Sequence, residues 1–283
     1  MSAKFGPGGN SDAFKRAGFS ATVDAPKWVK SVGLDAYEYE AGNGLTAGTA
    51  TLSAIGRAAK AAEIKMSYHT PYFISLSGVE IEKRLKSIEY IRQSIEASRL
   101  LGAETIVVHC GSAAKISRDE AMRLASDTLA RTLAEVDTYG IKIGIETMGK
   151  VNQLGTLDEV IEICRMDKRL VPVVDFGHLN ARGIGGVFTS CDDYLRVFDK
   201  ISRNLGAEVA ENLHCHFSKI EYTGAGEKRH LTFEDTVFGP PYEPLCEVIA
   251  REGLSPTIIS ESAGTQSDDA LTMKKEYLRY LEK

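Results

Sequence analysis

Short apolar runs alternate along the chain with longer segments in which apolar residues recur every three or four positions. The apolar runs predict β-strands at 4–6, 35–40, 64–69, 104–109, 141–146, 171–175, 212–217 and 257–261. The periodic segments predict helices at 24–32, 49–62, 80–101, 117–139, 156–166, 192–204, 242–251 and 268–282. Several strands are almost entirely apolar, which is typical of a parallel sheet covered by helices. These alternating elements predict a single (β/α)8 TIM barrel over residues 1–283.

The segment 80–101 has the clearest helical period. Its apolar residues are spaced for one buried face, and they are Ile81, Leu85, Ile88, Ile91, Ile95 and Leu101. A doubly wound open sheet is an alternative architecture with the same alternation of strands and helices. Candidate site residues at the ends of most strands favour the closed ring, because a barrel brings all of those ends together.

Composition excludes several classes of protein. Hydrophobic residues make up 43% of the chain and charged residues 26%, as in ordinary globular proteins. No apolar run approaches the roughly 20 residues that span a bilayer, and the start MSAKFGPGGN lacks a signal-peptide core. The five cysteines form no CxxC pair, and we expect Cys110 and Cys215 to be packing residues. We therefore expect a cytoplasmic protein with no membrane association and no obligate protein partner.

Net charge is −5, which argues mildly against a generic nucleic-acid binder. Divalent cations bound inside the protein would offset part of this charge where it matters most. The charge balance therefore does not exclude a polyanionic substrate.

Histidines and acids lie where the predicted strands end. In a barrel these ends converge on one pocket, which is where chemistry sits in this fold. Nitrogen and carboxylate ligands together suit zinc, manganese, iron or cobalt. The candidate ligands exceed what one ion needs, so we expect more than one ion, with Glu146 placed to bridge a pair. The strand-end candidates are His69, His109, Glu146, Asp175, His216 and Glu261, with His178 three positions after Asp175.

A more ordinary interpretation applies to each histidine alone, since a single histidine at a strand end is usually hydrogen-bonded structure. Several of them at the same end of different strands favour a site. His214 lies two positions before His216, so it points the same way but one layer deeper. We expect His214 to support the site or fill the core instead of binding metal.

The chain resembles the endonuclease IV family of apurinic/apyrimidinic endonucleases, within the xylose-isomerase-like barrels. The resemblance runs from about residue 60 to 265. It is carried by short segments whose order and spacing together are fairly specific: HTPYFISL at 69–76, HCGS at 109–112, GIETMGK with NQLGTLDE at 144–159, DFGHLNARG at 175–183, HFSK at 216–219, KRH at 228–230 and SES at 260–262.

This resemblance implies DNA base-excision repair by a zinc-dependent endodeoxyribonuclease that cleaves the phosphodiester 5′ to an abasic site. It implies about two or three zinc ions per chain, with a bridging hydroxide as the nucleophile; manganese or cobalt are alternatives. His69, His109 and Glu146 would bind the first ion, and His178 and His230 would belong to a third. The second ion would be bound by Glu146, Asp175, His216 and Glu261.

The resemblance also implies contacts with damaged double-stranded DNA. Tyr72 and Phe73 follow His69, in a loop that this family pushes into the DNA stack. Inserting apolar side chains selects an abasic site because that site has little stacking to lose. Lys219 and Arg229 are candidate phosphate contacts.

Two departures from the family pattern stand out. The third ion's aspartate is replaced by Lys228, which cannot ligate zinc. That site would then be vacant, filled only with substrate phosphate, or completed by another acid, and the candidates are Glu227, Glu234 and Asp235. Alternatively, Lys228 is itself catalytic and stabilises the leaving oxygen. The segment 35–42 lacks the expected basic residue and instead carries Glu38 and Glu40.

Two other functions remain open. In a sugar isomerase or epimerase, one Mn²⁺ or Co²⁺ on Glu146, Asp175, His216 and Glu261 would polarise a ketose while Glu146 and Glu261 move a proton. His178 would bind the sugar, and the pair His69 and His109 would have no metal to bind. A catalytically silent barrel that binds DNA or a metabolite is the third interpretation.

Overall fold

The computed structural model describes residues 2–282 and contains an eight-stranded parallel sheet curled into a nearly closed barrel. Around the ring the strands follow the order β1-β10-β7-β6-β5-β4-β3-β2. Their bounds are β1 (Lys4–Pro7), β2 (Ala36–Glu40), β3 (Lys65–His69), β4 (Ala103–His109), β5 (Lys142–Glu146), β6 (Leu170–Asp175), β7 (His214–Phe217) and β10 (Thr257–Ser260). The predicted (β/α)8 fold is confirmed, and each predicted strand is present within two residues of its expected bounds.

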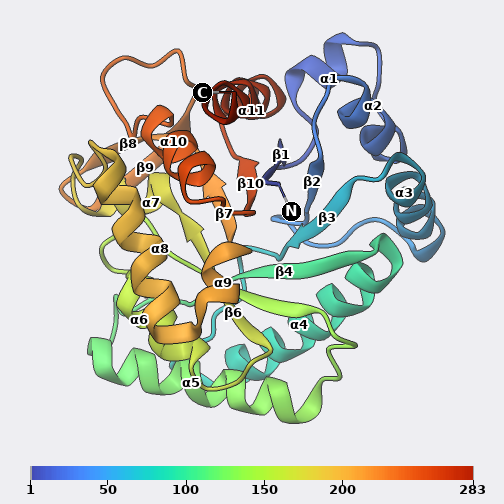
Figure 1. The fold of residues 1–283 in the computed structure, drawn as a ribbon. Helices are drawn as coiled ribbons and strands as arrows, with labels where there is room; N and C mark the ends of the chain where they lie inside the picture. The colour runs from blue at the N-terminus through green and yellow to red at the C-terminus, as the bar shows by residue number, and fades with distance from the viewer. Residues whose placement is uncertain (1, 283) are drawn as a thin grey trace.

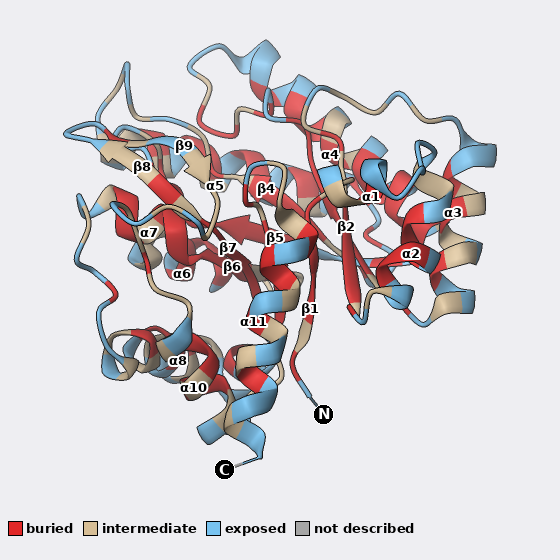
Figure 2. Ribbon diagram, turned by 90° about the horizontal axis from the view of Figure 1, so that it is seen from above, coloured by how far each residue is buried: buried red, intermediate tan, exposed pale blue. Residues whose placement is uncertain are grey.

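Helices surround the barrel and shield its strands from solvent (Figure 1). The main ones are α2 (Ala25–Ser31), α3 (Thr49–Ala62), α4 (Ile81–Leu101), α5 (Arg118–Glu135), α6 (Leu157–Cys164), α8 (Cys191–Leu205), α10 (Glu243–Arg251) and α11 (Gln266–Leu281). Buried residues follow the strands, and exposed residues follow the outer faces of the helices (Figure 2). Among the described residues, no helix has both the length and the apolar character needed to cross a bilayer.

The ring closes between its first two strands. The Asp35 N–H donates to the Phe5 carbonyl (2.9 Å) and the Gly9 N–H to the Glu38 carbonyl (3.0 Å). The two backbones approach so closely that a Cβ on Gly6 would lie 1.8 Å from the Ala36 carbonyl oxygen. Position 6 therefore requires glycine, because any side chain there would separate the strands that close the barrel.

The structure contains elements that the apolar pattern does not predict. They are the short helices α1 (Asp12–Arg16), η1 (Thr22–Asp24), α7 (Phe176–Arg182) and α9 (Ala207–Glu211), and the antiparallel hairpin β8 (Lys219–Thr223) and β9 (Gly226–Leu231). The hairpin follows β7 directly, at the carboxyl end of the barrel. It places His230 on β9, outside the eight strands that the apolar runs predict.

Two helix predictions were wrong in part. In α4, Ile88, Ile91, Ile95 and Leu101 are buried, but Ile81 and Leu85 are exposed. The buried positions of those first turns are polar instead. Arg84 donates to the carbonyls of Gly78 (2.6 Å) and Val79 (3.1 Å), so hydrogen bonds to the preceding loop replace apolar packing.

Helix α5 ends at Glu135 and not at 139. Val136 is already extended, and Tyr139 and Gly140 then take positive φ angles of 49° and 83°. This turn reverses the chain into β5 sooner than the apolar period suggests.

Candidate metal centre

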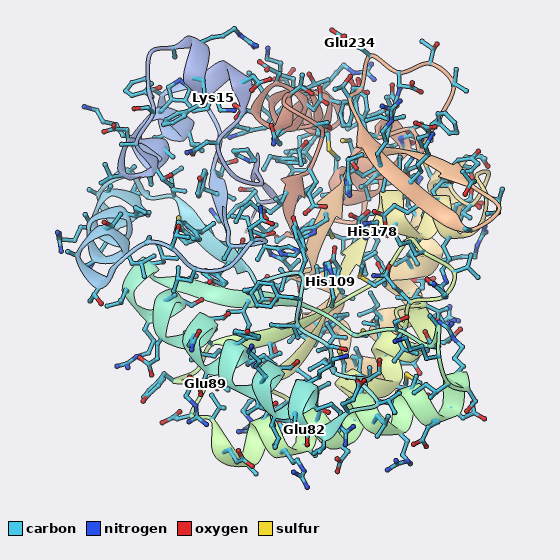
Figure 3. All side chains as sticks on the ribbon, turned by 180° about the vertical axis from the view of Figure 1, so that it is seen from behind. Lys15, Glu82, Glu89, His109, His178 and Glu234 are labelled. Carbon is cyan, nitrogen blue, oxygen red and sulfur yellow. The ribbon has the colours of Figure 1, made fainter. Side chains whose placement is uncertain are left out.

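Strand register brings the predicted ligands together at one end of the barrel. His109, the last residue of β4, pairs with Glu146, the last residue of β5, and Asp175 at the end of β6 pairs with His216 of β7. Parallel strands in register end at the same height, so their terminal side chains meet. His109 and His178 accordingly lie near the centre of the molecule, whereas Glu82 and Glu89 lie on its outer surface (Figure 3).

The first group of candidate ligands is His69, His109 and Glu146, whose ligand atoms lie within 4.8 Å of one another. His109 Nε2 is 2.9 Å and His69 Nε2 is 3.6 Å from Glu146 Oε2. His69 Nδ1 lies 2.9 Å from the Thr70 carbonyl, which can only accept a hydrogen bond. Nδ1 therefore donates to this carbonyl, which leaves Nε2 directed at the carboxylate.

The second group is Glu146, Asp175, His216 and Glu261. His216 Nδ1 lies 3.0 Å from Glu146 Oε1 and 3.3 Å from Glu261 Oε1. Asp175 caps helix α7, with its Oδ1 accepting from the His178 N–H at 2.7 Å. Its other oxygen, Oδ2, is buried and makes no hydrogen bond within the described chain. Because Glu146 belongs to both the first and second groups, it is positioned to join them.

The third group is His178, Glu227 and His230. His178 Nδ1 is 2.9 Å from the Thr147 carbonyl, so its Nε2 faces Glu227 Oε2 at 3.4 Å. His230 Nε2 lies 4.0 Å from Glu227 Oε1. Sequence reasoning offered Glu227 only as one of several acids that could complete this group. Glu234 and Asp235 are in none of the candidate metal groups found among residues 2–282.

Lys228 does not reach this cluster. Its side chain is 55% exposed, and its Nζ lies 2.6 Å from Glu221 Oε1 on the outer side of the hairpin. The β8–β9 pairing has a bulge here, with Glu221 opposite Arg229 and Tyr222 opposite Glu227, so Lys228 is the extra residue of β9. Lys228 therefore lies on the Glu221 side of the hairpin, whereas Glu227 lines the cavity. The same Glu221 also holds Arg229, at 2.6 Å.

Two acids that sequence reasoning treated only as departures from a pattern belong to the site. Glu38, on β2, is fully buried and lies 2.8 Å from His216 Nε2 and 2.9 Å from His214 Nε2. Glu40, two residues on, lines the cavity beside His69. The signal that could have found them is the alternation of β2, which points positions 38 and 40 to the same inner face.

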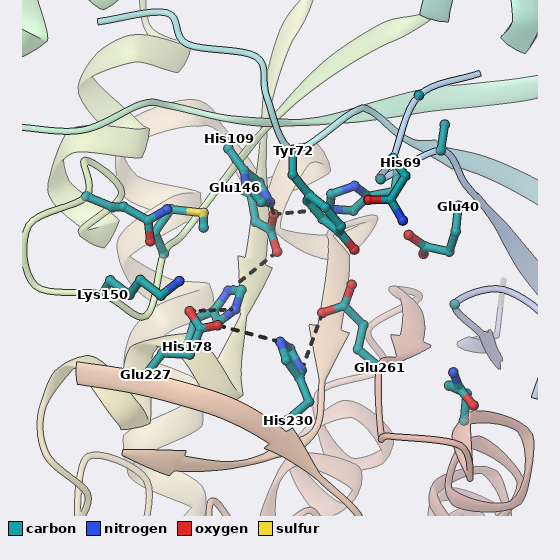
Figure 4. Close-up of a pocket in the computed structure, with 18 of the residues that line it drawn as sticks. Glu40, His69, Tyr72, His109, Glu146, Lys150, His178, Glu227, His230 and Glu261 are labelled. Atoms are coloured by element: carbon teal, nitrogen blue, oxygen red, sulfur yellow. Dashed lines mark ion pairs between the residues drawn. The ribbon is translucent and has the colours of Figure 1, made fainter. Parts of the chain in front are cut away.

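These residues open into a cavity of about 860 Å³. Figure 4 shows its floor, with Glu146 between the histidines and Glu261 and His230 on the opposite side. Tyr72 lies at the mouth, with its ring 5.6 Å from that of His109 and 58% of the residue exposed.

The other predicted DNA contacts lie outside this lining. Phe73 packs on Tyr90, with ring centroids 4.7 Å apart. Lys219 donates to the carbonyls of Phe233 and Asp235, so it holds the loop after the hairpin. Among the predicted DNA-binding residues, only Tyr72 is part of the cavity wall.

Burial and crowding shift the proton affinities of the cluster. Burial together with the charges of Glu146 and Asp175 raises the pKa of Glu261 to about 8. Burial also raises the pKa of Glu40, to about 7. Burial lowers the pKa of His69, but the carboxylates of Glu40 and Glu146 outweigh it and raise that pKa to about 10. Retained protons can therefore balance part of the carboxylate charge of the cluster.

The donor set fits divalent transition metals. Imidazole nitrogens and carboxylate oxygens suit zinc, manganese, iron and cobalt. Asp175 Oδ2 is buried without a hydrogen bond, and such an atom is stabilised when a cation neutralises it. The sequence-based expectation of a metal site is therefore met by the geometry of the side chains, while the identity of the metal stays a prediction.

A family model described as the xylose isomerase-like TIM barrel matches residues 26–283. An uncharacterized protein of Methanocaldococcus jannaschii is 30% identical over 216 residues, covering 75% of this chain and 77% of that protein. A probable endonuclease 4 of Acholeplasma laidlawii is 31% identical over 189 residues, covering 65% of this chain and 62% of that protein. The match thus spans less than two thirds of the endonuclease relative.

Two solved structures share the fold over nearly their whole length. A D-tagatose 3-epimerase-like protein aligns with a TM-score of 0.70 at 20% identity, covering 99% of this chain and 98% of that one. Endonuclease IV from Thermus thermophilus aligns with a TM-score of 0.69 at 19% identity, covering 99% of each. These scores differ too little to separate the two activities, and the fold alone is what they share with this chain.

Replacing Glu38 with glutamine should weaken metal binding without unfolding the barrel. Glu38 fixes His216 through Nε2, which leaves Nδ1 directed at Glu146 and Glu261. Loss of a residue that orients a metal ligand without itself binding the metal typically lowers metal affinity about 10- to 100-fold. Titration with zinc should show this loss, whereas Glu159→Gln, a half-buried carboxylate outside the cavity, should leave affinity unchanged. Equal affinity in both variants would contradict the role of Glu38.

Metal affinity should rise with pH between about 6 and 8. A pKa raised to about 8 keeps Glu261 protonated near neutral pH, and His69, with a pKa of about 10, also retains a proton. A metal must displace these protons, so raising the pH favours binding. Calorimetry in buffers of different ionisation enthalpy should detect at least about one proton released per chain at pH 7. Release of no proton would contradict this account.

Proposed function

The chain belongs to the xylose isomerase-like TIM barrel family, and from this premise we propose that it hydrolyses the phosphodiester 5′ to abasic sites in double-stranded DNA. The proposal makes it a cytoplasmic DNA-repair endonuclease with about two or three zinc ions per chain. Residues 1–283 would act as one unit, with damaged DNA as the partner. Support comes from the endonuclease relative and from the cluster at the end of the barrel.

The single observation that carries the proposal is the pair His69 and His109 facing Glu146 beside a complete second ligand group. A single-ion sugar enzyme needs Glu146, Asp175, His216 and Glu261 but has no use for that histidine pair. Adjacent groups that share one carboxylate are typical of sites where two ions act on a phosphodiester. Bound ions would supply a nucleophile at neutral pH and would neutralise charge on the phosphate oxygens.

The protein's own side chains have distinct parts in this proposal. Glu146 faces four histidines and holds the first two ligand groups together. His178, Glu227 and His230 form the third group, so Glu227 is the acid, of the three considered from the sequence, that would complete it. Tyr72, exposed at the cavity mouth, would contact the gap left by the missing base, because an abasic nucleotide offers little stacking to displace.

A sugar isomerase or epimerase is the second candidate, and Glu40 favours it. This acid adds negative charge to the cavity wall, which disfavours a polyanion but not a neutral sugar. In that function one manganese or cobalt ion would lie on the second group. Glu146 and Glu261 would then move a proton next to the carbonyl.

Incision of a defined lesion tests the proposal. Zinc-supplemented protein should cut a labelled duplex 5′ to a tetrahydrofuran abasic analogue, leave the undamaged duplex intact, and lose activity on chelation. Glu146→Gln should lower the incision rate by more than the roughly 100-fold that is typical when a residue orienting a metal ligand is lost. Lys168→Met, an exposed change before β6 at the opposite end of the barrel, is the matched control.

Absence of incision with Zn²⁺, Mn²⁺ or Co²⁺, together with epimerisation of a ketose, would show that the protein is a sugar epimerase and not a nuclease.

The third ligand group should depend on Glu227 and not on Lys228. Glu227→Gln should lower bound zinc by about one ion per chain, because it removes the one carboxylate between His178 and His230. Lys228→Asp should leave the zinc content unchanged, since position 228 points out toward Glu221. Elemental analysis after dialysis measures both. A gain of zinc in Lys228→Asp would show that position 228 can turn into the site.

A further inference from the structure

The cavity wall carries several acids and, within the described residues, a single lysine and no arginine. Glu40, Glu146, Glu227 and Glu261 line it, and Lys150 is the only lysine or arginine among its lining residues within 2–282. Lys150 follows β5 by four residues, in the loop that leads to α6. Its ammonium group points into the cavity, toward the space between His178 and His109 (Figure 4).

Lys150 differs from the cations near it in having no ion pair of its own within the described chain. Lys228 and Arg229 share Glu221, and Lys219 is bound to backbone carbonyls. No carboxylate among residues 2–282 makes an ion pair with the Lys150 ammonium, and its side chain is exposed to the cavity. A cation without a partner beside four acids contributes little to stability and is available to a ligand.

The backbone of Lys150 is held far more firmly than that of an ordinary surface loop. Arg182 donates to the carbonyls of Met148 (3.1 Å), Lys150 (2.7 Å), Val151 (2.9 Å) and Gln153 (3.1 Å). Arg118 donates to the carbonyls of Val151 (3.2 Å) and Gln153 (2.9 Å). The hydrogen bonds of two guanidinium groups thus hold this loop in one shape, so the backbone of Lys150 is positioned before a ligand binds.

The hairpin fixes the same loop from the other side. The Glu227 N–H donates to the Gly149 carbonyl (3.1 Å), and the Val151 N–H donates to the Ala225 carbonyl (3.1 Å). A Cβ on Gly226 would lie 2.2 Å from the Gly149 carbonyl oxygen, so glycine is required for this approach. The contact sets Lys150 and Glu227 in a fixed relation across the cavity.

We propose that the Lys150 ammonium binds a non-bridging oxygen of the substrate phosphate and holds it over the ligand cluster. This inference rests on the proposed function, because it assigns the phosphate-contacting residue of that same site. An ammonium is a compact point charge that suits a phosphate oxygen, and the described part of the cavity wall carries no other lysine or arginine. Lys150 is a specificity residue: it favours a phosphodiester over an uncharged sugar of similar size.

The test compares zinc-loaded wild-type protein with Lys150→Met, Lys150→Arg and the control Lys168→Met. The probe is inorganic phosphate, titrated by calorimetry after equal zinc content has been confirmed. A hydrogen bond to a charged group is worth about 10- to 150-fold in affinity, so Lys150→Met should weaken phosphate binding within that range. Lys150→Arg should retain most of it, and Lys168→Met should match wild type.

Incision kinetics give a second readout. Lys150→Met should raise KM for the abasic duplex more than it lowers kcat, because the contact forms already in the bound substrate. Unchanged phosphate affinity in Lys150→Met would overturn the inference, as would a wild-type protein that binds no phosphate.

The two proposals fail separately. If no variant incises DNA but Lys150→Met still loses phosphate affinity relative to Lys168→Met, Lys150 is a phosphate-binding residue of a different enzyme. If incision proceeds with unchanged KM and phosphate affinity in Lys150→Met, the nuclease stands and the assignment of Lys150 falls.

Discussion

Buried negative charge at the carboxyl end of the barrel is the constraint on which the rest of this structure depends. Glu38, Glu146 and Asp175 are fully buried there, with Glu40 and Glu261 beside them. Taking a carboxylate out of water costs several kcal/mol, and like charges in a medium of low dielectric add to this cost. The fold can hold these buried carboxylates only if protons or cations neutralise part of their charge. The raised pKa values of Glu40, Glu261 and His69 are the signs of that balance in the absence of a cation.

In four of the histidines, one ring nitrogen is anchored by a neighbouring group and the other faces a carboxylate. In His69 and His178, Nδ1 is occupied by a neighbouring backbone carbonyl, while His216 uses Nε2 on Glu38. His230 Nδ1 is bound to the Ser218 hydroxyl. Each ring therefore presents its remaining nitrogen to a carboxylate. Such anchoring fixes the ring and its tautomer before any ligand arrives, so binding need not reorganise the protein.

The sequence alone predicted the site residues best where strand register determines which side chains meet. The ends of parallel strands must meet, so side chains at the ends of β3 to β6 could be assigned to one place without coordinates. Glu38 was missed as a partner because it was considered only as a departure from the family pattern. Alternation along 35–40 gives positions 38 and 40 a shared face, but only the barrel shows that Glu38 meets His214 and His216 of β7. Glu227 was underrated because the polar run GEKRH does not predict a strand. The bulge in β9 also breaks the alternation, so strand periodicity alone would not place Glu227 and His230 on the same side.

The hairpin β8–β9 explains how one barrel end can add chemistry to its ring of strands. The first two ligand groups come from strand ends that are set by the sheet, whereas Glu227 and His230 arrive on a separate pair of strands. The position of the hairpin depends on the close approach of Gly226 to Gly149, and that contact also fixes the loop carrying Lys150.

The same arrangement bears on how an acidic protein could bind a polyanion. With a net charge of −5, and with Lys228 and Arg229 both committed to Glu221, the hairpin offers little unpaired positive charge to phosphates. Attraction would then come mainly from inside the cavity, from bound cations and Lys150. Charges at that depth are screened by salt less than those on a surface. Recognition of this kind favours a single accessible phosphate over a long tract of duplex, which is consistent with the proposed function.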